Sequence, residues 1–425
     1  MTLIKLICGD CREVMETFKE NSFDSIVTDP PYELKFMGKK WDGSGISYDE
    51  KVWKECLRVL KPGGYLLAFG GTRTYHRLTC KIEDVGFELH PLIGWCYGSG
   101  FPKATNLSKQ IDKAAGAERE VIGSSPYAAR RPHDSIATFC MQDGRDHAPP
   151  HTNDITAPAT DLAKKWDGWY YGKQSLKPAL EPICMAQKPT DGKMVLNVEK
   201  WECGAVNIDA SRIGTEDTIS PSGETVTTNC HQGYQRPNAS MFNTGKPKER
   251  SGPANPSGRW PANLILGHAP GCVRRGESNW DCVEGCAVRL IAEQSGHLKS
   301  GKVKPYKNNG GWKQTSDFKT GSFEASEGTA ARFFFQVDPD PLFYCAKASK
   351  KERGENNSHP TVKPLKLMKY LVRLVTPPGG TVLDPFAGSG TTLLAAKEEN
   401  FNAVGIELDN EYIKIAIERG CGMEL

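Results

Sequence analysis

The sequence contains no long apolar run and carries little net charge. Over its 425 residues the formal net charge is +3, the mean hydropathy is −0.49 and charged residues make up 25%. A membrane-spanning helix needs about 20 consecutive apolar residues, so no such helix is expected. The low net charge also excludes strong overall attraction to a polyanion. Contact with an acidic partner must therefore come from local basic patches.

The sequence also has no recognisable export signal and no regular cysteine framework. The N-terminal MTLIKLICGD leads directly into a predicted strand, so we expect no signal peptide. The 14 cysteines are scattered along the chain. Without an export signal we expect most of them to be buried thiols in a cytoplasmic protein rather than disulfides.

The segment TVLDPFAGSGTT, residues 381–392, lacks both the lysine of a Walker loop and the spacing of a GxGxxG loop. It predicts a buried strand, a turn in which Gly388 and Gly390 let the backbone approach a ligand, and the start of a helix. A second predicted strand, 404–407, ends at Glu407. An acid at this place can accept hydrogen bonds from both hydroxyls of a ribose.

A proline turn, TDPPY at residues 28–32, follows another predicted buried strand at 25–27. Each motif alone has an ordinary structural explanation, but both lie at strand ends. Together, DPPY and DPFAGSGTT resemble the catalytic and S-adenosylmethionine-binding motifs of amino-group DNA methyltransferases. The catalytic motif comes first, an insert follows and the cofactor motif comes last. This order is similar to that of the β group of these enzymes, which includes phage and bacterial members.

The resemblance implies an α/β fold, namely a Rossmann-like methyltransferase domain with permuted motif order and a mostly parallel seven-stranded sheet. Alternating strand and helix patterns near the N-terminus also indicate a parallel sheet. We expect residues 1–105 to form the first part of the catalytic domain, 170–190 to add a sheet strand and 340–425 to form the cofactor-binding part. Residues 106–169 are predicted to be an insertion. Residues 191–339, which show no sustained helical periodicity, are predicted to be an irregular target-recognition insert.

The family motifs assign roles to particular residues of this chain. The resemblance places Asp10 near the adenine of the cofactor, although Asp10 also suits the N-cap of the helix expected after it. Thr361 and Lys363, in an HPTVKP segment, are expected near the methionine end. The complete set expected around S-adenosylmethionine is Asp10, Cys11, Asp29, Thr361, Lys363, Asp384, Pro385, Phe386, Gly388, Ser389, Gly390, Thr391 and Glu407.

The predicted catalytic residues are Asp29, Pro30, Pro31 and Tyr32. An exocyclic amino group is a poor nucleophile because its lone pair is delocalised into the base. The Asp29 carboxylate and the Pro30 carbonyl can accept its two N–H bonds, and both contacts strengthen as positive charge develops on nitrogen. Pro30 and Pro31 keep the turn rigid, while Tyr32 offers a ring face to a base extruded from the duplex. No covalent enzyme intermediate is needed, and the sequence has no Pro-Cys dipeptide of the 5-methylcytosine type.

The residue before the two prolines bears on the base that is methylated. Family members with Asp there mostly methylate adenine N6, and those with Ser mostly methylate cytosine N4. Asp29 therefore favours site-specific adenine-N6 methylation of double-stranded DNA, with cytosine N4 as the alternative. A non-catalytic module that binds S-adenosylmethionine and DNA is another alternative, which the intact DPPY motif disfavours. The family also allows a cognate restriction nuclease, a homodimer and a bacterial or phage-infected host.

Two local patterns carry further expectations. Residues 47–50, SYDE, read as a capping box that starts a helix with Ser47 as its N-cap. Between residues 299 and 319, six lysines are interleaved with Tyr306, Trp312 and Phe318. Such a segment suits contact with DNA phosphates, with a solvated loop as the alternative.

A possible metal site lies within the insert. Three residues separate His268 from Cys272, and after nine further residues Cys282 and Cys286 repeat this spacing. Two ligand pairs joined by a short polar loop suit tetrahedral zinc. A region with little apolar periodicity also needs another source of stability, which a metal would supply. The alternative is three buried thiols and a surface histidine.

Overall fold

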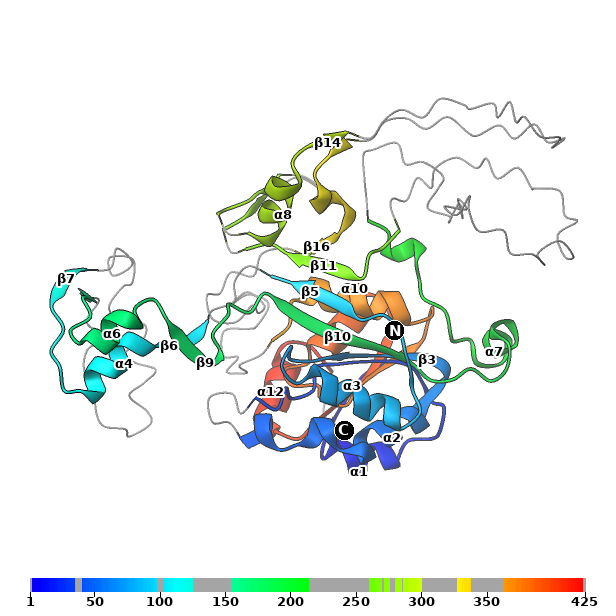
Figure 1. The fold of residues 1–425 in the computed structure, drawn as a ribbon. Coiled ribbons are helices and arrows are strands. Elements are labelled where there is room, and N and C mark those ends of the chain that lie inside the picture. Colours follow the sequence, from blue (N-terminus) through cyan, green and yellow to red (C-terminus); the bar gives the residue numbers. More distant parts are fainter. Residues whose placement is uncertain are drawn as a thin grey trace, which may run out of the picture. The chain divides into compact units, whose positions relative to one another are not determined.

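The computed structural model describes residues 2–34, 40–97, 102–124, 154–213, 260–269, 271–275, 280–284, 286–299, 327–337 and 362–422. They fall into two compact units (Figure 1). One unit combines Met1–Gly100 with Ala179–Leu425, and the other is Phe101–Pro178. None of the helices among these residues is long and apolar enough to cross a membrane.

The larger unit is built on a sheet in which ten strands are described. Their order is β1-β18-β17-β2-β3-β10-β5-β11-β16, and β4 also pairs with β10. The strands are β1 (Ile4–Cys8), β2 (Phe23–Thr28), β3 (Leu60–Phe69), β4 (Glu88–Leu89), β5 (Ile93–Cys96), β10 (Leu180–Gln187), β11 (Leu264–Gly267), β16 (Phe335–Val337), β17 (Thr381–Asp384) and β18 (Asn402–Glu407).

The strand directions confirm the predicted Rossmann-like α/β fold. Strands β1, β18, β17, β2 and β3 are all parallel, whereas β10 is antiparallel to both β3 and β5. The described sheet has more strands than the seven predicted. The reason is that β4 pairs with β10, while β11 and β16, from the predicted insert, continue the sheet beyond β5 in parallel.

Helices cover both faces of the parallel part of the sheet. The helices of this unit are α1 (Cys11–Glu16), α2 (Glu50–Val59), α3 (Tyr75–Asp84), α7 (Met194–Trp201), α8 (Ala287–Ser295), α10 (Leu365–Val375), α11 (Thr391–Glu398) and α12 (Asn410–Glu418). Short 3-10 helices are η2 (Lys40–Gly43), η3 (Ile46–Tyr48), η5 (Asp209–Ser211) and η7 (Ala330–Phe333).

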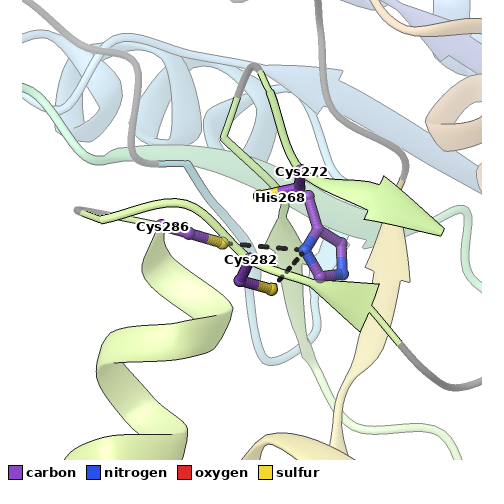
Figure 2. A group of neighbouring side chains, drawn as sticks. All are labelled: His268, Cys272, Cys282 and Cys286. Carbon is purple, nitrogen blue, oxygen red and sulfur yellow. Dashed lines mark hydrogen bonds between the residues drawn. The ribbon is translucent and has the colours of Figure 1, made fainter. Parts of the chain in front are cut away.

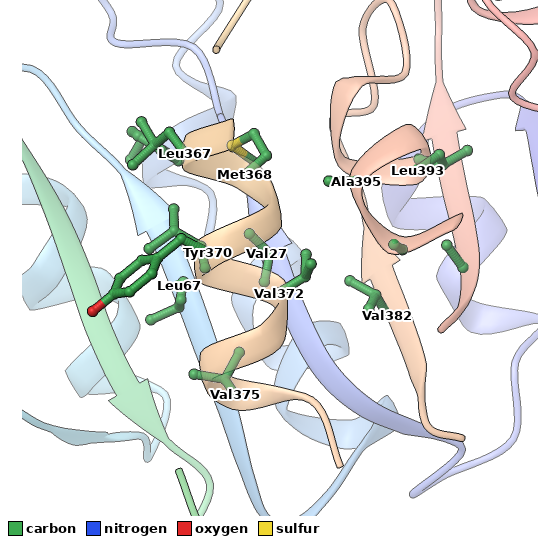
Figure 3. Close-up of a cluster of buried hydrophobic side chains, with 14 of the residues drawn as sticks. Val27, Leu67, Leu367, Met368, Tyr370, Val372, Val375, Val382, Leu393 and Ala395 are labelled. Atoms are coloured by element: carbon green, nitrogen blue, oxygen red, sulfur yellow. The ribbon is translucent and has the colours of Figure 1, made fainter. Parts of the chain in front are cut away.

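Successive residues of the central strands enter two different hydrophobic cores. In β2, Val27 packs with α10 and α11, while Ile26 packs with α1, α2 and α3. Leu66 and Leu67 of β3 divide between the same two cores, and Figure 3 shows the core that contains Val27 and Leu67. Because side chains alternate across a strand and both faces are covered, all of β2 is buried. The apolar run 25–27 in the sequence therefore lies in a central strand that is buried on both faces.

The smaller unit has its own pairing pattern. Its strands are β6 (Lys103–Asn106), β7 (Val121–Ser124), β8 (Asp154–Thr156) and β9 (Tyr170–Gln174), and its helices are α4 (Leu107–Ala114) and α6 (Asp161–Lys165). β6 pairs with β9 and β7 with β8, both antiparallel. Buried Asp112 joins α4 to α6 by accepting hydrogen bonds from Arg119 and Thr160. Of the range 170–190, only Leu180–Gln187 enters the large sheet.

Candidate active site

The proline turn and the glycine turn meet at one edge of the large sheet. β17 lies between β2 and β18 and is parallel to both, with Leu383 opposite Ile26 and Asp384 opposite Gly405. The carboxyl ends of the three strands therefore lie at the same edge, where open α/β sheets bind ligands. There the Thr28 hydroxyl donates a hydrogen bond to the Asp384 carboxylate, with 2.6 Å between the oxygens. The two motifs, far apart in the sequence, are joined directly.

The glycine turn requires left-handed backbone at two positions. The φ angle is 51° at Gly388 and 79° at Gly390. Gly390 directly precedes α11, and a Cβ atom there would collide with the sulfur of Cys421. The Gly388 N–H donates to the Glu407 carboxylate at the end of β18, at 2.8 Å. The turn thus brings bare backbone close to an acid on the neighbouring strand.

Two carboxyl groups at this edge are buried. Burial raises the pKa of Asp384 to about 6, although hydrogen bonds from Thr28 and from the Phe386 N–H oppose the rise. Burial also raises the pKa of Glu407, against the effect of backbone N–H groups that donate to it. A buried anion is costly unless a cation or hydrogen-bond donor compensates it. The edge therefore favours a ligand that carries positive charge.

The Asp29 carboxylate is paired with a buried lysine that directly precedes the N-cap of α10. Lys363 Nζ lies 2.6 Å from Asp29 Oδ2 and 3.5 Å from Glu181 Oε2. The Tyr32 hydroxyl donates to the same Glu181 oxygen at 2.7 Å. Burial alone would lower the pKa of Lys363, but the charges of Asp29 and Glu181 outweigh burial and raise it. Lys363, which the sequence assigned to the methionine end of the cofactor, thus contacts the predicted catalytic acid.

Side chains from two other segments hold the proline turn in place. The Ser47 hydroxyl donates to the Pro31 carbonyl, and the Thr74 hydroxyl donates to the Tyr32 carbonyl at 2.8 Å. The predicted role of Ser47 as a helix cap is therefore wrong. Helix α2 has Asp49 as its N-cap, because the Asp49 carboxylate accepts the N–H of Lys51 in the first turn of the helix. Ser47 lies in η3 and stabilises the turn that contains the candidate catalytic residues.

The other predicted cofactor residues have the following positions. Asp10 is the N-cap of α1, accepts the Arg12 N–H at 2.9 Å and also pairs with the Arg12 guanidinium, whose hydrogen bond lowers the pKa of Asp10. Cys11 is buried, and burial raises the pKa of its thiol to about 12. Pro385, Phe386, Ser389 and Thr391 lie in or directly after the glycine turn, whereas Thr361 lies outside the described residues.

Comparison with protein families agrees with this geometry. The N6/N4 methyltransferase family, described as DNA methylase, matches residues 23–418. The chain belongs to this DNA methylase family. It is 57% identical over 61 residues to the type II methyltransferase M.HindIII of Haemophilus influenzae, which is 14% of this chain and 20% of that protein. It is 45% identical over 65 residues to the DNA adenine methyltransferase YhdJ of Escherichia coli, 15% of this chain and 22% of that protein.

Those two alignments span only about a fifth of each relative's length. Among solved structures, the chain aligns with the cytosine-N4-specific PvuII DNA methyltransferase at a TM-score of 0.41 and 15% identity. That alignment covers 99% of this chain and 87% of the other.

The methylase chain also brings together the four predicted metal ligands. His268 follows β11, Cys272 and Cys282 flank the hairpin of β12 (Val273–Arg274) and β13 (Trp280–Asp281), and Cys286 precedes α8. Their ligand atoms all lie within 4.8 Å of one another (Figure 2). The basic segment 299–319 lies outside the described residues except for the backbone of Lys299.

Several members of the methylase site were not assigned from the sequence. Glu181 lies in β10, which reads as an ordinary buried strand, yet a charged residue in such a strand is itself a signal of function. Ser47 and Thr74 carry no comparable signal, because a hydroxyl that anchors a distant carbonyl looks the same in sequence as any surface hydroxyl. Thr28 was visible as part of TDPPY, but its bond to Asp384 depends on the pairing of β2 with β17.

Proposed function

We propose that this chain transfers a methyl group from S-adenosylmethionine to the exocyclic amino group of a base in double-stranded DNA, with adenine N6 as the acceptor. The observation that carries the proposal is the hydrogen bond from Thr28 to Asp384. It fixes the turn of the candidate base-binding acid, Asp29, against the glycine turn of the candidate cofactor site. A methyl donor and an amine held by these two turns would be neighbours, as direct transfer requires.

The charges and hydrogen bonds of the edge suit the cofactor. S-adenosylmethionine carries a sulfonium and an ammonium group, and buried Asp384 and Glu407 favour a cationic ligand. Glu407 accepts the N–H groups of Gly388 and Asp409, which orient its carboxylate. A carboxylate has about four acceptor positions, so the same group can also accept both ribose hydroxyls. The left-handed glycines keep side chains away from the ligand.

The Asp29 network supports a specific sequence of contacts at the base. Lys363 forms an ion pair with Asp29 before the substrate arrives. The incoming amine then donates to Asp29 and to the Pro30 carbonyl, and the positive charge that develops on its nitrogen as the S–CH3 bond breaks competes with Lys363 for the same carboxylate. Glu181, already 3.5 Å from Lys363, can receive the lysine. This exchange lets positive charge develop on the amine nitrogen beside an acid no longer neutralised by Lys363.

The choice of adenine rests on Asp29 in the DPPY motif and on the similarity to YhdJ, a DNA adenine methyltransferase. Cytosine N4 is the competing acceptor. The similarity to M.HindIII, a type II methyltransferase, supports pairing with a cognate restriction nuclease in a bacterial or phage-infected cytoplasm. A homodimer is part of the same proposal.

The test is methyl transfer from radiolabelled S-adenosylmethionine to DNA, RNA and protein offered in parallel. We expect label in DNA only, and mass spectrometry of the digested DNA should identify N6-methyladenine. N4-methylcytosine would overturn the choice of base, and label in RNA or protein would overturn the substrate class. Glu181→Gln tests the exchange, since it should lower kcat much more than it weakens cofactor binding. Unchanged kcat in that variant would remove Glu181 from the mechanism.

A further inference from the structure

The His/Cys cluster, consisting of His268, Cys272, Cys282 and Cys286, joins three short elements to the end of a sheet strand. His268 directly follows β11, the β12–β13 hairpin brings two cysteines, and the fourth ligand is the residue before α8. Figure 2 shows the side chains directed toward a common centre. We propose that this cluster binds one structural Zn²⁺ ion through three thiolates and one imidazole. The proposal is independent of the methyl-transfer reaction.

The distances fit a tetrahedral metal. The Nδ1 atom of His268 lies 3.3 Å from the sulfur of Cys282 and 3.6 Å from that of Cys286. Bond lengths of roughly 2.3 Å to sulfur and 2.05 Å to nitrogen place tetrahedral ligands about 3.6 Å (S to N) and about 3.8 Å (S to S) apart. All four ligand atoms lie within 4.8 Å of one another, so a small inward movement completes the shell.

A chain of hydrogen bonds sets the histidine tautomer that a metal needs. The Gln336 amide nitrogen donates to the Ala331 carbonyl at 3.1 Å, which orients its side-chain oxygen toward His268. That oxygen lies 3.0 Å from His268 Nε2 and must accept its proton. Nε2 is therefore the protonated nitrogen, and Nδ1 presents a lone pair to the cysteines. Metal-bound histidines are typically oriented by this kind of outer hydrogen bond.

The surroundings also suit zinc-bound thiolates. Backbone N–H groups of Ala269 and Arg289 donate to the Cys286 sulfur, as is favourable for an anionic sulfur. The Arg289 guanidinium donates to the Cys282 carbonyl at 3.2 Å and places a positive charge beside the cluster. Three thiolates and Zn²⁺ have a net charge of −1, which this arginine would partly offset. The ring of Trp280 stacks on His268 with centroids 4.0 Å apart and shields that side.

The local core is too small to hold these elements by itself. In the part of the chain that the structure describes, two of its six buried members are proposed ligands, and the other hydrophobic side chains packed against it are only partly buried. The six are Leu266, Ala269, Cys272, Cys286, Val288 and Ala331. The hairpin strands have two residues each. Small units with so little apolar burial usually depend on disulfides or metals, and these cysteines form no disulfide. Four protein ligands would also fill the tetrahedral shell, which indicates a structural rather than a catalytic ion.

The first test measures metal in the full-length protein, purified without chelator. We expect about one zinc per chain by elemental analysis, the stoichiometry of a single four-ligand site. X-ray absorption at the zinc edge should show three sulfur ligands and one nitrogen ligand. Cobalt substitution should give the visible bands of a tetrahedral thiolate site. A folded sample without zinc, or zinc with an oxygen-rich shell, would overturn the proposal.

Variants then locate the ion. Cys282→Ser and His268→Ala should lose most of the bound zinc, whereas Cys80→Ser should retain it, because Cys80 is exposed and lies on α3 outside the cluster. If the ligand variants keep the metal of the wild type, the site is elsewhere. If they do not fold, the absorption spectrum of the wild-type protein still decides the ligand set.

Discussion

The motif edge, formed by the ends of β2, β17 and β18, and the His/Cys cluster are held in different ways. The motif edge rests on parallel strands with a hydrophobic core on each face. The His/Cys cluster rests on a six-residue core and on its own ligands. A thick core can position costly buried charges such as Asp384 and Lys363. The small core around the His/Cys cluster needs metal–ligand bonds in addition. The two regions should therefore lose their structure or activity under different treatments.

The largest expected effect is a loss of catalysis at the motif edge without unfolding of the protein. Asp29→Asn keeps the shape of the side chain but removes the anion that favours a developing positive charge. We expect kcat to fall at least about a hundredfold, while calorimetry shows S-adenosylmethionine still bound. Near-normal turnover would contradict the proposed role of Asp29. Asp84→Asn, on the exposed end of α3, is the matched control and should leave kcat unchanged.

Metal removal should destabilise the region around the His/Cys cluster and leave the motif edge intact. After chelation of zinc, amide hydrogen exchange should accelerate in β11, the β12–β13 hairpin and α8. Protection in β17 and β18 should stay unchanged, because the core around them contains none of the ligands. Equal loss of protection in both regions would show that they unfold as one unit. Protection that is unchanged everywhere would show that the cluster needs no metal.

A smaller effect should come from the acid at the end of β18. Glu407→Gln keeps an acceptor oxygen but loses the charge and one of the two acceptors proposed for the ribose. Hydrogen bonds to a charged group contribute about 1.5–3 kcal/mol, so cofactor affinity should fall about tenfold to a hundredfold. Calorimetry with S-adenosylmethionine measures this directly. Unchanged affinity would place the ribose elsewhere. Glu411→Gln, exposed on α12, serves as the control.

The smallest expected effect is a pH dependence caused by Asp384. Its folded pKa of about 6 lies above the ordinary value, so the folded state holds this proton more tightly than the unfolded state. Asp384 therefore favours folding most below the unfolded pKa of about 4, and this contribution is lost as the pH rises through about 6. Asp384→Asn cannot ionise. The free energy of unfolding of the variant, minus that of the wild type, should therefore increase from pH 5 to pH 7, as measured by urea titrations. If this difference does not change with pH, the buried-acid interpretation is wrong.

Sequence reasoning recovered the parts of this protein that depend on local patterns. Apolar runs such as 25–27 and 381–383 identified central strands, and the glycines of 388–390 identified the turn. The regular spacing of His268 with three cysteines was enough to predict a cluster, because short loops restrict where its members can go. The structure of each of these features is determined by residues that are close together in the sequence.

The contacts that depend on strand order could not be read in the same way. Lys363 meets Asp29 only because α10 packs over β2 and β3, and no local pattern encodes that contact. The addition of β11 and β16 to the sheet was missed since both strands are short and lie within the predicted insert. Ser47 matched a capping pattern, but the Pro31 carbonyl competed successfully for its hydroxyl.

The pairing of β1 with β18 and of β2 with β17 has a consequence for biosynthesis. A ribosome releases β1 and β2 first, but β18, which pairs with β1, and β17, one of the two partners of β2, belong to the last part of the sheet to be made. The Thr28–Asp384 bond cannot form until the C-terminal strands have emerged. Contacts so distant in sequence fold slowly, and the apolar early strands stay exposed meanwhile. The nascent chain therefore cannot assemble its joined motif edge until β17 and β18 have been synthesised.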